Sequence, residues 1–184
     1  MPLRAPKEAM LALNFSSSPH GAEEETMKAV TDAAEAGPQA GDPRASFSHA
    51  GVTVRFMLGG NAIVTFESEK TGTHFTYRVQ APKKVWGSAS HFVAVLTSPD
   101  QYTYLGCIFG SKVYAHGRNS KIGPEATSAK AFMWAWKKLS AGIMPEGMGV
   151  FHEGRCGRCS RRLTTPESVS SGIGPECAKK MEGG

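Results

Sequence analysis

The sequence predicts an α+β fold in which a mostly antiparallel sheet is covered by one main helix. Three observations lead to this prediction. Short stretches of alternating apolar and polar residues follow one another between residues 51 and 115, and short turns join them. One strongly amphipathic stretch comes next, and it needs an apolar surface to pack against. The chain also contains 21 glycines in 184 residues, which favours a turn-rich fold over a helical bundle.

Length and composition suit one domain with a small appendage. The chain has 184 residues, of which 40% are hydrophobic, and this is enough apolar material for one core. We divide it into an N-terminal arm over residues 1–50, a sheet with its helix over 51–145, and a small unit over 146–184. No stretch of 18 apolar residues is present, and the N-terminus has no long apolar segment. Neither a membrane span nor a secretory signal is therefore expected.

The arm is predicted to be helical or mobile. Residues 16–19 and 37–43 are rich in Ser, Gly and Pro, which is typical of linkers. Residues 22–36 between them are rich in Glu and Ala, with a thin apolar stripe at helical spacing. We expect a weak acidic helix there.

Alternating patterns predict the strands. The dipeptide Gly59-Gly60 marks a tight turn between two such runs, which is the signature of a hairpin. Short connections of this kind join neighbouring strands in antiparallel order. Six stretches are predicted to be strands: 51–58, 62–66, 73–79, 91–96, 102–109 and 112–115.

The main helix is predicted to begin at Pro124 and to end before Gly142, which suits the C′ position. Its apolar residues recur at helical spacing, so we expect this stripe to cover the sheet. The residues expected to be buried between sheet and helix are Phe92, Val95, Leu96, Ile108, Phe132, Met133 and Trp136.

Three of the four cysteines lie near the C-terminus. Cys156 and Cys159 have C-x-x-C spacing, which lets one tight turn direct two thiolates at one tetrahedral ion. Cys177 follows Pro175 in what reads as the first turn of a short helix, where backbone N–H groups stabilise a thiolate. The fourth cysteine, Cys107, lies inside a predicted strand and reads as a core residue. This pattern predicts a structural Zn²⁺ site.

A closed structural zinc site has four ligands. His152 precedes Cys156 by four residues and is our candidate for the fourth ligand, while His116 and a water molecule stay open as alternatives. A redox pair would need a βαβ context, and a disulfide would leave one cysteine of the cluster unpaired. Both patterns suit the sequence less well than a metal site.

The segment from His152 to Cys177 reads C-G-R-C, then L-T-x-P-E-S, then G-I-G-P-x-C. It resembles a small family of zinc-ribbon-like domains of unknown function that are frequent in phage and mobile-element proteins. The resemblance is strongest over residues 151–178, fades through 91–140 and does not cover the first 50 residues. Family members often have Gly where this chain has Ser160, which bears on the turn after the second cysteine.

The resemblance implies zinc binding and an origin in the conflict between phages and bacteria. Small zinc-containing proteins of this origin include anti-CRISPR inhibitors, which bind an RNA-guided effector nuclease. By this association, the expected location is the cytoplasm of a bacterial host cell. The ligands that the resemblance implies are Cys156, Cys159, Cys177 and His152.

No arrangement of nucleophile, base and orienting group is evident in the sequence, so we expect a binding protein and not an enzyme. We also expect no small-molecule substrate. Residues 112–144 carry six basic residues and one acidic residue, and residues 155–162 carry four arginines. Such surfaces suit an acidic host protein, whose activity would be blocked, such as a nuclease prevented from loading target DNA. The alternative is nucleic acid bound through 112–138 and 155–162. The predicted contact residues are Lys112, Arg118, Lys121, Arg155, Arg158, Arg161 and Arg162.

Overall fold

A computed structural model describes residues 44–82, 89–110 and 112–183 of the chain. Most of the predicted arm, including the acidic helix expected over 22–36, lies outside these ranges. Within them, no helix is long and apolar enough to cross a membrane.

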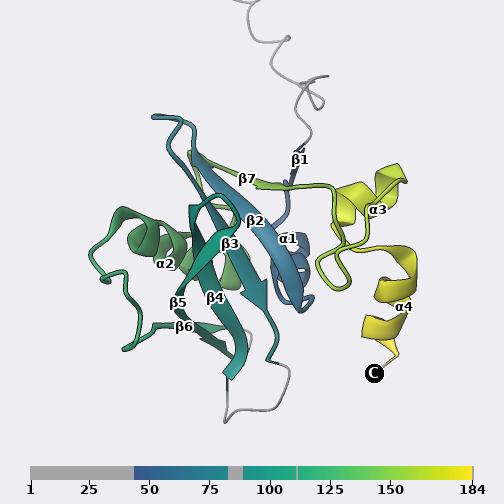
Figure 1. Cartoon of the computed structure of the whole chain (residues 1–184). Coiled ribbons are helices and arrows are strands. Elements are labelled where there is room, and N and C mark those ends of the chain that lie inside the picture. Colours follow the sequence, from purple (N-terminus) through teal and green to yellow (C-terminus); the bar gives the residue numbers. More distant parts are fainter. Residues whose placement is uncertain (1–43, 83–88, 111, 184) are drawn as a thin grey trace, which may run out of the picture. The chain divides into compact units, whose positions relative to one another are not determined.

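The described residues form one seven-stranded antiparallel sheet with four helices, which confirms the α+β prediction. The strands lie in the order β1-β7-β2-β3-β4-β5-β6 (Figure 1). Their bounds are β1 Ala45–Ser46, β2 Asn61–Ser68, β3 His74–Gln80, β4 Ala89–Ser98, β5 Gln101–Phe109, β6 Val113–His116 and β7 Met148–His152. The sheet extends beyond the predicted 51–145 region. Strand β1 comes from the segment assigned to the arm (1–50), and β7 comes from the segment predicted as a small unit (146–184).

Two helices, α1 (Ala50–Met57) and α2 (Thr127–Ser140), contact each other and share one hydrophobic core with the sheet. The prediction of a strand over 51–58 is wrong, because these residues form α1. The alternation of Val52, Val54 and Phe56 suggested a strand, yet the buried positions recur at helical spacing. α2 begins at Thr127, later than predicted, and Gly142 follows it with the positive φ of 81° expected at C′.

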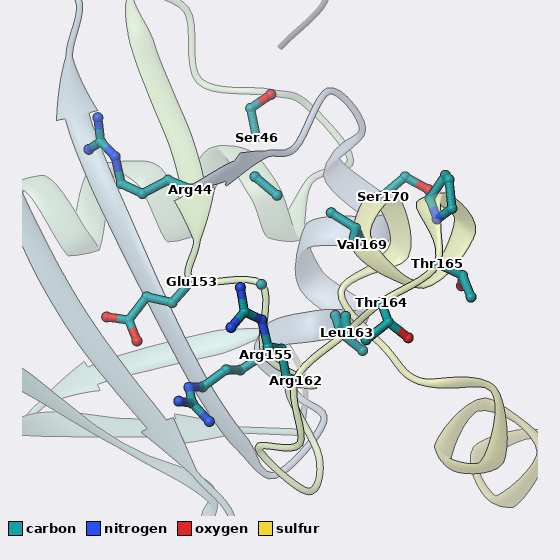
Figure 2. Close-up of a pocket in the computed structure, with 13 residues that line it drawn as sticks. Arg44, Ser46, Glu153, Arg155, Arg162, Leu163, Thr164, Thr165, Val169 and Ser170 are labelled. Carbon is teal, nitrogen blue, oxygen red and sulfur yellow. The ribbon is translucent and has the colours of Figure 1, made fainter. Parts of the chain in front are cut away.

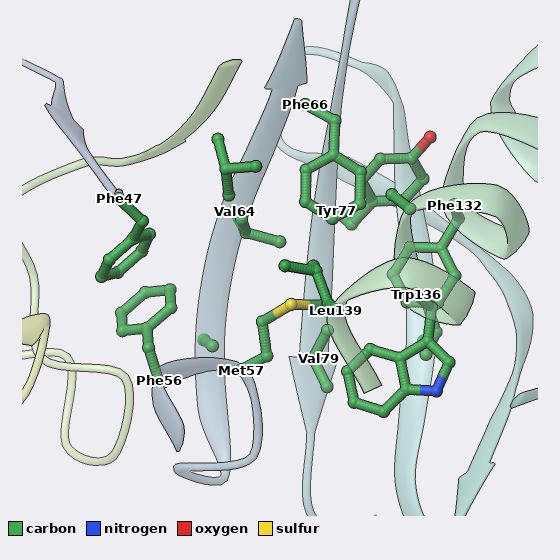
Figure 3. Packing of buried hydrophobic residues seen from close by; sticks show 14 of the residues in the cluster. Phe47, Phe56, Met57, Val64, Phe66, Tyr77, Val79, Phe132, Trp136 and Leu139 are labelled. Atoms are coloured by element: carbon green, nitrogen blue, oxygen red, sulfur yellow. The ribbon is translucent and has the colours of Figure 1, made fainter. Parts of the chain in front are cut away.

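The core lies between the sheet and α1 and α2. Figure 3 shows Phe132 and Trp136 of α2 and Met57 of α1 in one layer with Val64 of β2 and Val79 of β3. Phe132 stacks on the Trp136 ring with an interplanar angle of 3°. Two polar atoms inside this layer are satisfied, since the Tyr77 hydroxyl donates to the Ser128 carbonyl at 2.7 Å and the Trp136 indole N–H donates to the Lys112 carbonyl at 3.1 Å.

Four of the seven residues expected in the core are buried, namely Val95, Ile108, Phe132 and Trp136. The other three expectations are wrong. Phe92 and Leu96 are 37% exposed because they alternate with Val93 and Val95 and so lie on the sheet face that α1 and α2 do not cover. Met133 is 44% exposed, because the buried face of α2 instead includes Ala135.

The missed strand β7 places the C-terminal unit. It pairs with β2 on one side and with β1 on the other, and it ends at His152. The chain after β7 therefore starts from a fixed point beside α1. Figure 1 shows it continuing into α3 (Pro166–Ser171) and α4 (Pro175–Glu182) on this side of the sheet, where α3 contacts both α1 and β1. We call residues 153–183 the C-terminal unit.

Candidate metal centre

The C-x-x-C pair lies in a tight turn that hydrogen bonds close on both sides. The Cys156 N–H donates to the Arg161 carbonyl at 2.8 Å, and the Ser160 N–H donates to the Cys156 carbonyl at 2.9 Å. Ser160 closes the turn with a left-handed φ of 59°. Its hydroxyl accepts a hydrogen bond from the side-chain amide of Asn61 on β2. The turn is thus formed with serine in the conformation that glycine adopts most easily.

Backbone contacts seat this turn on the C-terminal end of α1. The Gly157 carbonyl accepts from the Asn61 N–H at 2.7 Å, and the Gly157 N–H donates to the Gly172 carbonyl at 3.0 Å. A Cβ atom at Gly157 would lie 2.6 Å from the Phe56 carbonyl oxygen, which is too close. Glycine is therefore needed inside the C-x-x-C loop because the loop packs against another part of the backbone.

Two short helices bring Cys177 back to the pair, as the sequence predicted. Helix α3 begins with a capping box between Thr165 and Ser168 and ends at Gly172 in the left-handed conformation. Pro175 opens α4, and Cys177 lies in its first turn. Helix α3 and the first turn of α4 therefore bring the Cys177 sulfur close to those of Cys156 and Cys159.

The three sulfur atoms of Cys156, Cys159 and Cys177 lie within 4.8 Å of one another. Four ligands at about 2.3 Å from a zinc ion leave neighbouring sulfurs slightly under 4 Å apart, so this spacing fits three corners of a tetrahedron. Cys156 is buried, Cys177 is half-buried and Cys159 is exposed. The cluster can hold a metal ion with one side open to solvent.

Local hydrogen bonding favours the thiolate of Cys156 over that of Cys177. Burial alone would raise the pKa of Cys156, but N–H groups of Gly174, Cys159 and Arg158 outweigh burial and lower it to about 7. Burial and the two neighbouring sulfurs raise the pKa of Cys177 to about 11. The expected backbone N–H donors to the Cys177 sulfur are not among the causes of this pKa, which burial and the neighbouring sulfurs set.

His152 is not part of the cluster, so the structure does not support it as the fourth ligand. Its Nε2 lies 2.9 Å from the Val169 carbonyl, and its Nδ1 accepts the Gly154 N–H at 3.2 Å. Both ring nitrogens are thus engaged. The ring is 1% exposed and stacks on Phe47 with centroids 4.8 Å apart. Burial lowers the pKa of His152, and the bond to Val169 offsets this only in part. The neutral imidazole links the end of β7 to α3.

His116, the alternative fourth ligand, and Cys107, which was assigned to the core, both lie outside the cluster. Cys107 is a buried residue of β5 whose sulfur is 3.1 Å from the Tyr104 hydroxyl, as its core assignment predicted. The Nε2 atom of His116 is 2.9 Å from the Ile122 carbonyl. Among the residues that the structure describes, only the three cysteines form a metal-ligand cluster.

All seven predicted basic contact residues are exposed: Lys112, Arg118, Lys121, Arg155, Arg158, Arg161 and Arg162. Two of them meet directly, because Arg155 and Arg162 pair across an isolated antiparallel β-bridge. The Arg158 guanidinium donates to the Cys177 carbonyl at 3.4 Å and so ties the two halves of the cluster together.

Sequence reasoning missed a pocket beside the cluster. It has a volume of about 880 Å³ and lies between β1, the segments around Arg155 and Arg162, and α3 (Figure 2). Arg44 and Glu153 also line it. The four arginines of residues 155–162 indicate a basic surface, but no local sequence pattern indicates that this segment faces β1.

Together, these features describe an α+β protein with a three-cysteine cluster suited to a metal ion. Residues 147–182 match the sequence profile of a family of unknown function, DUF6011. The matched segment contains all three cysteines of the cluster. The chain matches no curated protein and no solved structure.

Proposed function

We propose that this chain is a non-enzymatic zinc protein in which Zn²⁺, held by Cys156, Cys159 and Cys177, stabilises a surface that binds a partner. The convergence of the three sulfur atoms carries this proposal. Thiolates are soft ligands that favour Zn²⁺ over Mg²⁺, Ca²⁺ or Mn²⁺, and the spacing of the sulfurs suits a tetrahedral ion. Three neighbouring thiolates repel one another, and a divalent cation removes this cost.

The surroundings of the cluster favour a structural role for the ion. A catalytic zinc site holds a base close to the metal-bound water. Within the described part of the chain, no histidine or carboxylate joins the cluster. His152, the nearest histidine in sequence, uses both ring nitrogens elsewhere.

The exposed basic residues support partner binding. Four arginines lie within eight residues of the turn that holds the ion, so the metal would fix their backbone in place. An acidic protein surface is the partner that such a group fits. By the association with phage proteins, the partner would be a host protein, specifically an RNA-guided nuclease whose loading of target DNA is blocked. That identity rests on the resemblance alone.

Metal analysis tests the centre. Purified chain should contain about one zinc per molecule, and a chelator that removes it should loosen the C-terminal unit. A well-folded protein that contains no metal and takes up none when Zn²⁺ is added would contradict the proposal.

Charge reversal tests the binding surface. The combined change of Lys121, Arg158 and Arg162 to Glu should weaken capture of a host partner while zinc content stays at one per chain. The matched control reverses Lys70, Lys83 and Lys84, which lie outside 112–162, and should bind normally. Equal binding by both variants would exclude the basic surface.

Salt dependence separates the two classes of partner. A steep fall of affinity with salt that disappears after nuclease treatment of the partner would identify nucleic acid in place of an acidic protein.

A further inference from the structure

The pocket beside the metal cluster holds two arginines of like charge directly opposite each other. Arg155 and Arg162 pair across the β-bridge, so their side chains leave the same face, a few ångströms apart at Cβ. Like charges in this arrangement repel, which disfavours the folded state. Both residues line the pocket, as Figure 2 shows. An anion bound between them would turn this repulsion into attraction.

No described carboxylate forms a salt bridge with either arginine of this pair. Glu153 lines the same pocket, but across the described residues it forms no salt bridge with either arginine. Its carboxylate instead affects the Tyr102 phenol. Burial is the main cause that raises the pKa of this phenol, and the charge of Glu153 raises it to a smaller extent. Arg44, the third arginine of the pocket, is 2.7 Å from Glu67 and lies over the Phe151 ring. The charge available to a ligand therefore comes from Arg155 and Arg162.

The two guanidinium groups have donors to spare. Arg155 uses one N–H on the Ser160 carbonyl at 3.2 Å, which orients its side chain, and a guanidinium carries five N–H donors. Arg162 makes no side-chain hydrogen bond or ion pair with any described residue. Two planar forks with a combined charge of +2 match the dianion of a phosphate monoester, whose three terminal oxygens can accept from both.

The rest of the pocket is too large and too apolar for phosphate alone. Its volume of about 880 Å³ lies in the range of pockets that hold small organic ligands. Buried Leu163 and half-buried Val169 form an apolar wall, and Thr164 adds a hydroxyl beside it. A flat heterocyclic base could pack against this wall, whereas a sugar phosphate without a base would leave the apolar side chains in contact with water.

We propose that this pocket binds the 5′-phosphate of a nucleotide, with Arg155 and Arg162 on the phosphate and the base against Leu163 and Val169. The nucleotide is either free or the 5′ end of a single-stranded oligonucleotide. The inference rests on the proposed metal centre in one respect, because the unit that the metal stabilises also carries both arginines.

Isothermal titration of the full chain with adenosine 5′-monophosphate, adenosine, and a short oligo(dT) with or without a 5′-phosphate tests the pocket. The monophosphate or the phosphorylated oligonucleotide should bind, and the ligands without the phosphate should bind at least tenfold more weakly. Binding of the phosphorylated oligonucleotide alone would identify a strand end as the ligand. Equal binding of both oligonucleotides would overturn the proposal in favour of backbone phosphates.

A matched pair of variants completes the test. Arg162→Gln removes the pocket arginine whose side chain makes no hydrogen bond or ion pair with any described residue, and it should weaken nucleotide binding about tenfold or more. Lys121→Gln makes the same change in net charge outside the pocket and should leave nucleotide binding unchanged. Zinc content is measured on each sample. Metal-loaded protein that binds neither phosphate ligand would overturn the pocket alone. Metal-free protein that binds through Arg162 would overturn the metal centre alone, and failure of both measurements would overturn both.

Discussion

The sheet and the C-terminal unit are stabilised in different ways. Strands β2 to β5 and helices α1 and α2 contribute most of the core, including Trp136, Tyr77, Phe66 and Phe132 as fully buried side chains. The C-terminal unit buries little. No residue of α4 is buried, α3 buries only Ser168, and the buried apolar side chains of the unit are Cys156, Leu163 and Ile173.

This difference shows what each region needs in order to fold. Burying a large apolar side chain contributes about 1.5–3 kcal/mol, so the sheet has many such contributions and the unit has few. Three apolar side chains of the C-terminal unit are buried, and bonds between a metal ion and thiolates contribute folding free energy in small units of this kind. We therefore expect the unit to depend on the metal and the sheet to fold without it.

The change with the largest expected effect is Cys156→Ser. It removes the most buried ligand, so zinc should be lost and residues 153–183 should lose protection from amide hydrogen exchange, because metal binding contributes about 10 kcal/mol or more in small zinc units. The strands β2 to β5 should keep their protection. The control Cys107→Ser changes a cysteine of the sheet and should keep one zinc per chain. Protection of the unit in zinc-free Cys156→Ser would show that apolar packing suffices.

Truncation of a side chain in the sheet core should destabilise the sheet and leave the metal site largely unchanged. Phe132→Ala removes a fully buried ring that contacts Tyr77, Phe66 and Trp136, and it should lower the free energy of unfolding by about 3–5 kcal/mol. Zinc affinity should change little. Met133→Ala, one position along, changes a side chain that is 44% exposed and should cost under about 1 kcal/mol. Urea unfolding of the two variants measures the difference, and equal losses would contradict the assignment of the buried face of α2.

His152 lies where the two regions meet, so His152→Ala tests the boundary between them. The change leaves a cavity between Phe47 and Phe56 and removes partners from the Val169 carbonyl and the Gly154 N–H, at a cost of about 3 kcal/mol. One zinc per chain should remain. With Co²⁺ in place of Zn²⁺, the d–d absorption bands should match those of the unchanged protein. A shift in these bands would return His152 to the ligand set.

The stabilising effect of His152 should depend on pH. Burial lowers its pKa below the ordinary value of 6.5, so the folded state binds fewer protons than the unfolded state between these two values. Its contribution is complete above about pH 7 and is lost as the pH falls through 6.5 toward the native pKa. With Zn²⁺ saturating, the stability gap between unchanged protein and His152→Ala should be smaller at pH 5.5 than at pH 7.5. A gap that widens in acid would contradict a neutral buried ring.

In both regions, the structural features that could be predicted from the sequence are those that depend on a local sequence pattern. The C-x-x-C spacing, Pro175 before Cys177 and the helical turn from Thr165 to Gly172 are local signals, and the structure has all of them. The antiparallel sheet after residue 61 followed from its turns in the same way.

The expectations that failed depend on contacts between distant residues. The sequence of α1 resembles a strand because its apolar residues Val52, Val54 and Phe56 alternate with other residues, and only packing on the sheet and α2 selects the helix. Phe92 was expected inside because nothing local shows which face of a strand is covered. The assignment of His152 to the metal failed because its partner, Val169, lies 17 residues away. The pocket was missed because one wall comes from β1.

The smallest expected effect concerns Ser160, where this chain differs from the glycine common in the resembling family. Its left-handed φ of 59° costs a residue with a Cβ about 1 kcal/mol, and the hydrogen bond from Asn61 to its hydroxyl repays about the same amount. Ser160→Ala keeps the strain but loses the bond, so it should weaken zinc binding by about 1 kcal/mol. Ser160→Gly loses both and should be close to neutral. Competition with a chromogenic chelator measures both affinities, and Asn61→Ala should reproduce the alanine result if the hydrogen bond is the cause. If glycine instead strengthened binding well beyond the natural serine, the bond between β2 and the turn would contribute nothing, and the sheet would not help to hold the metal site in place.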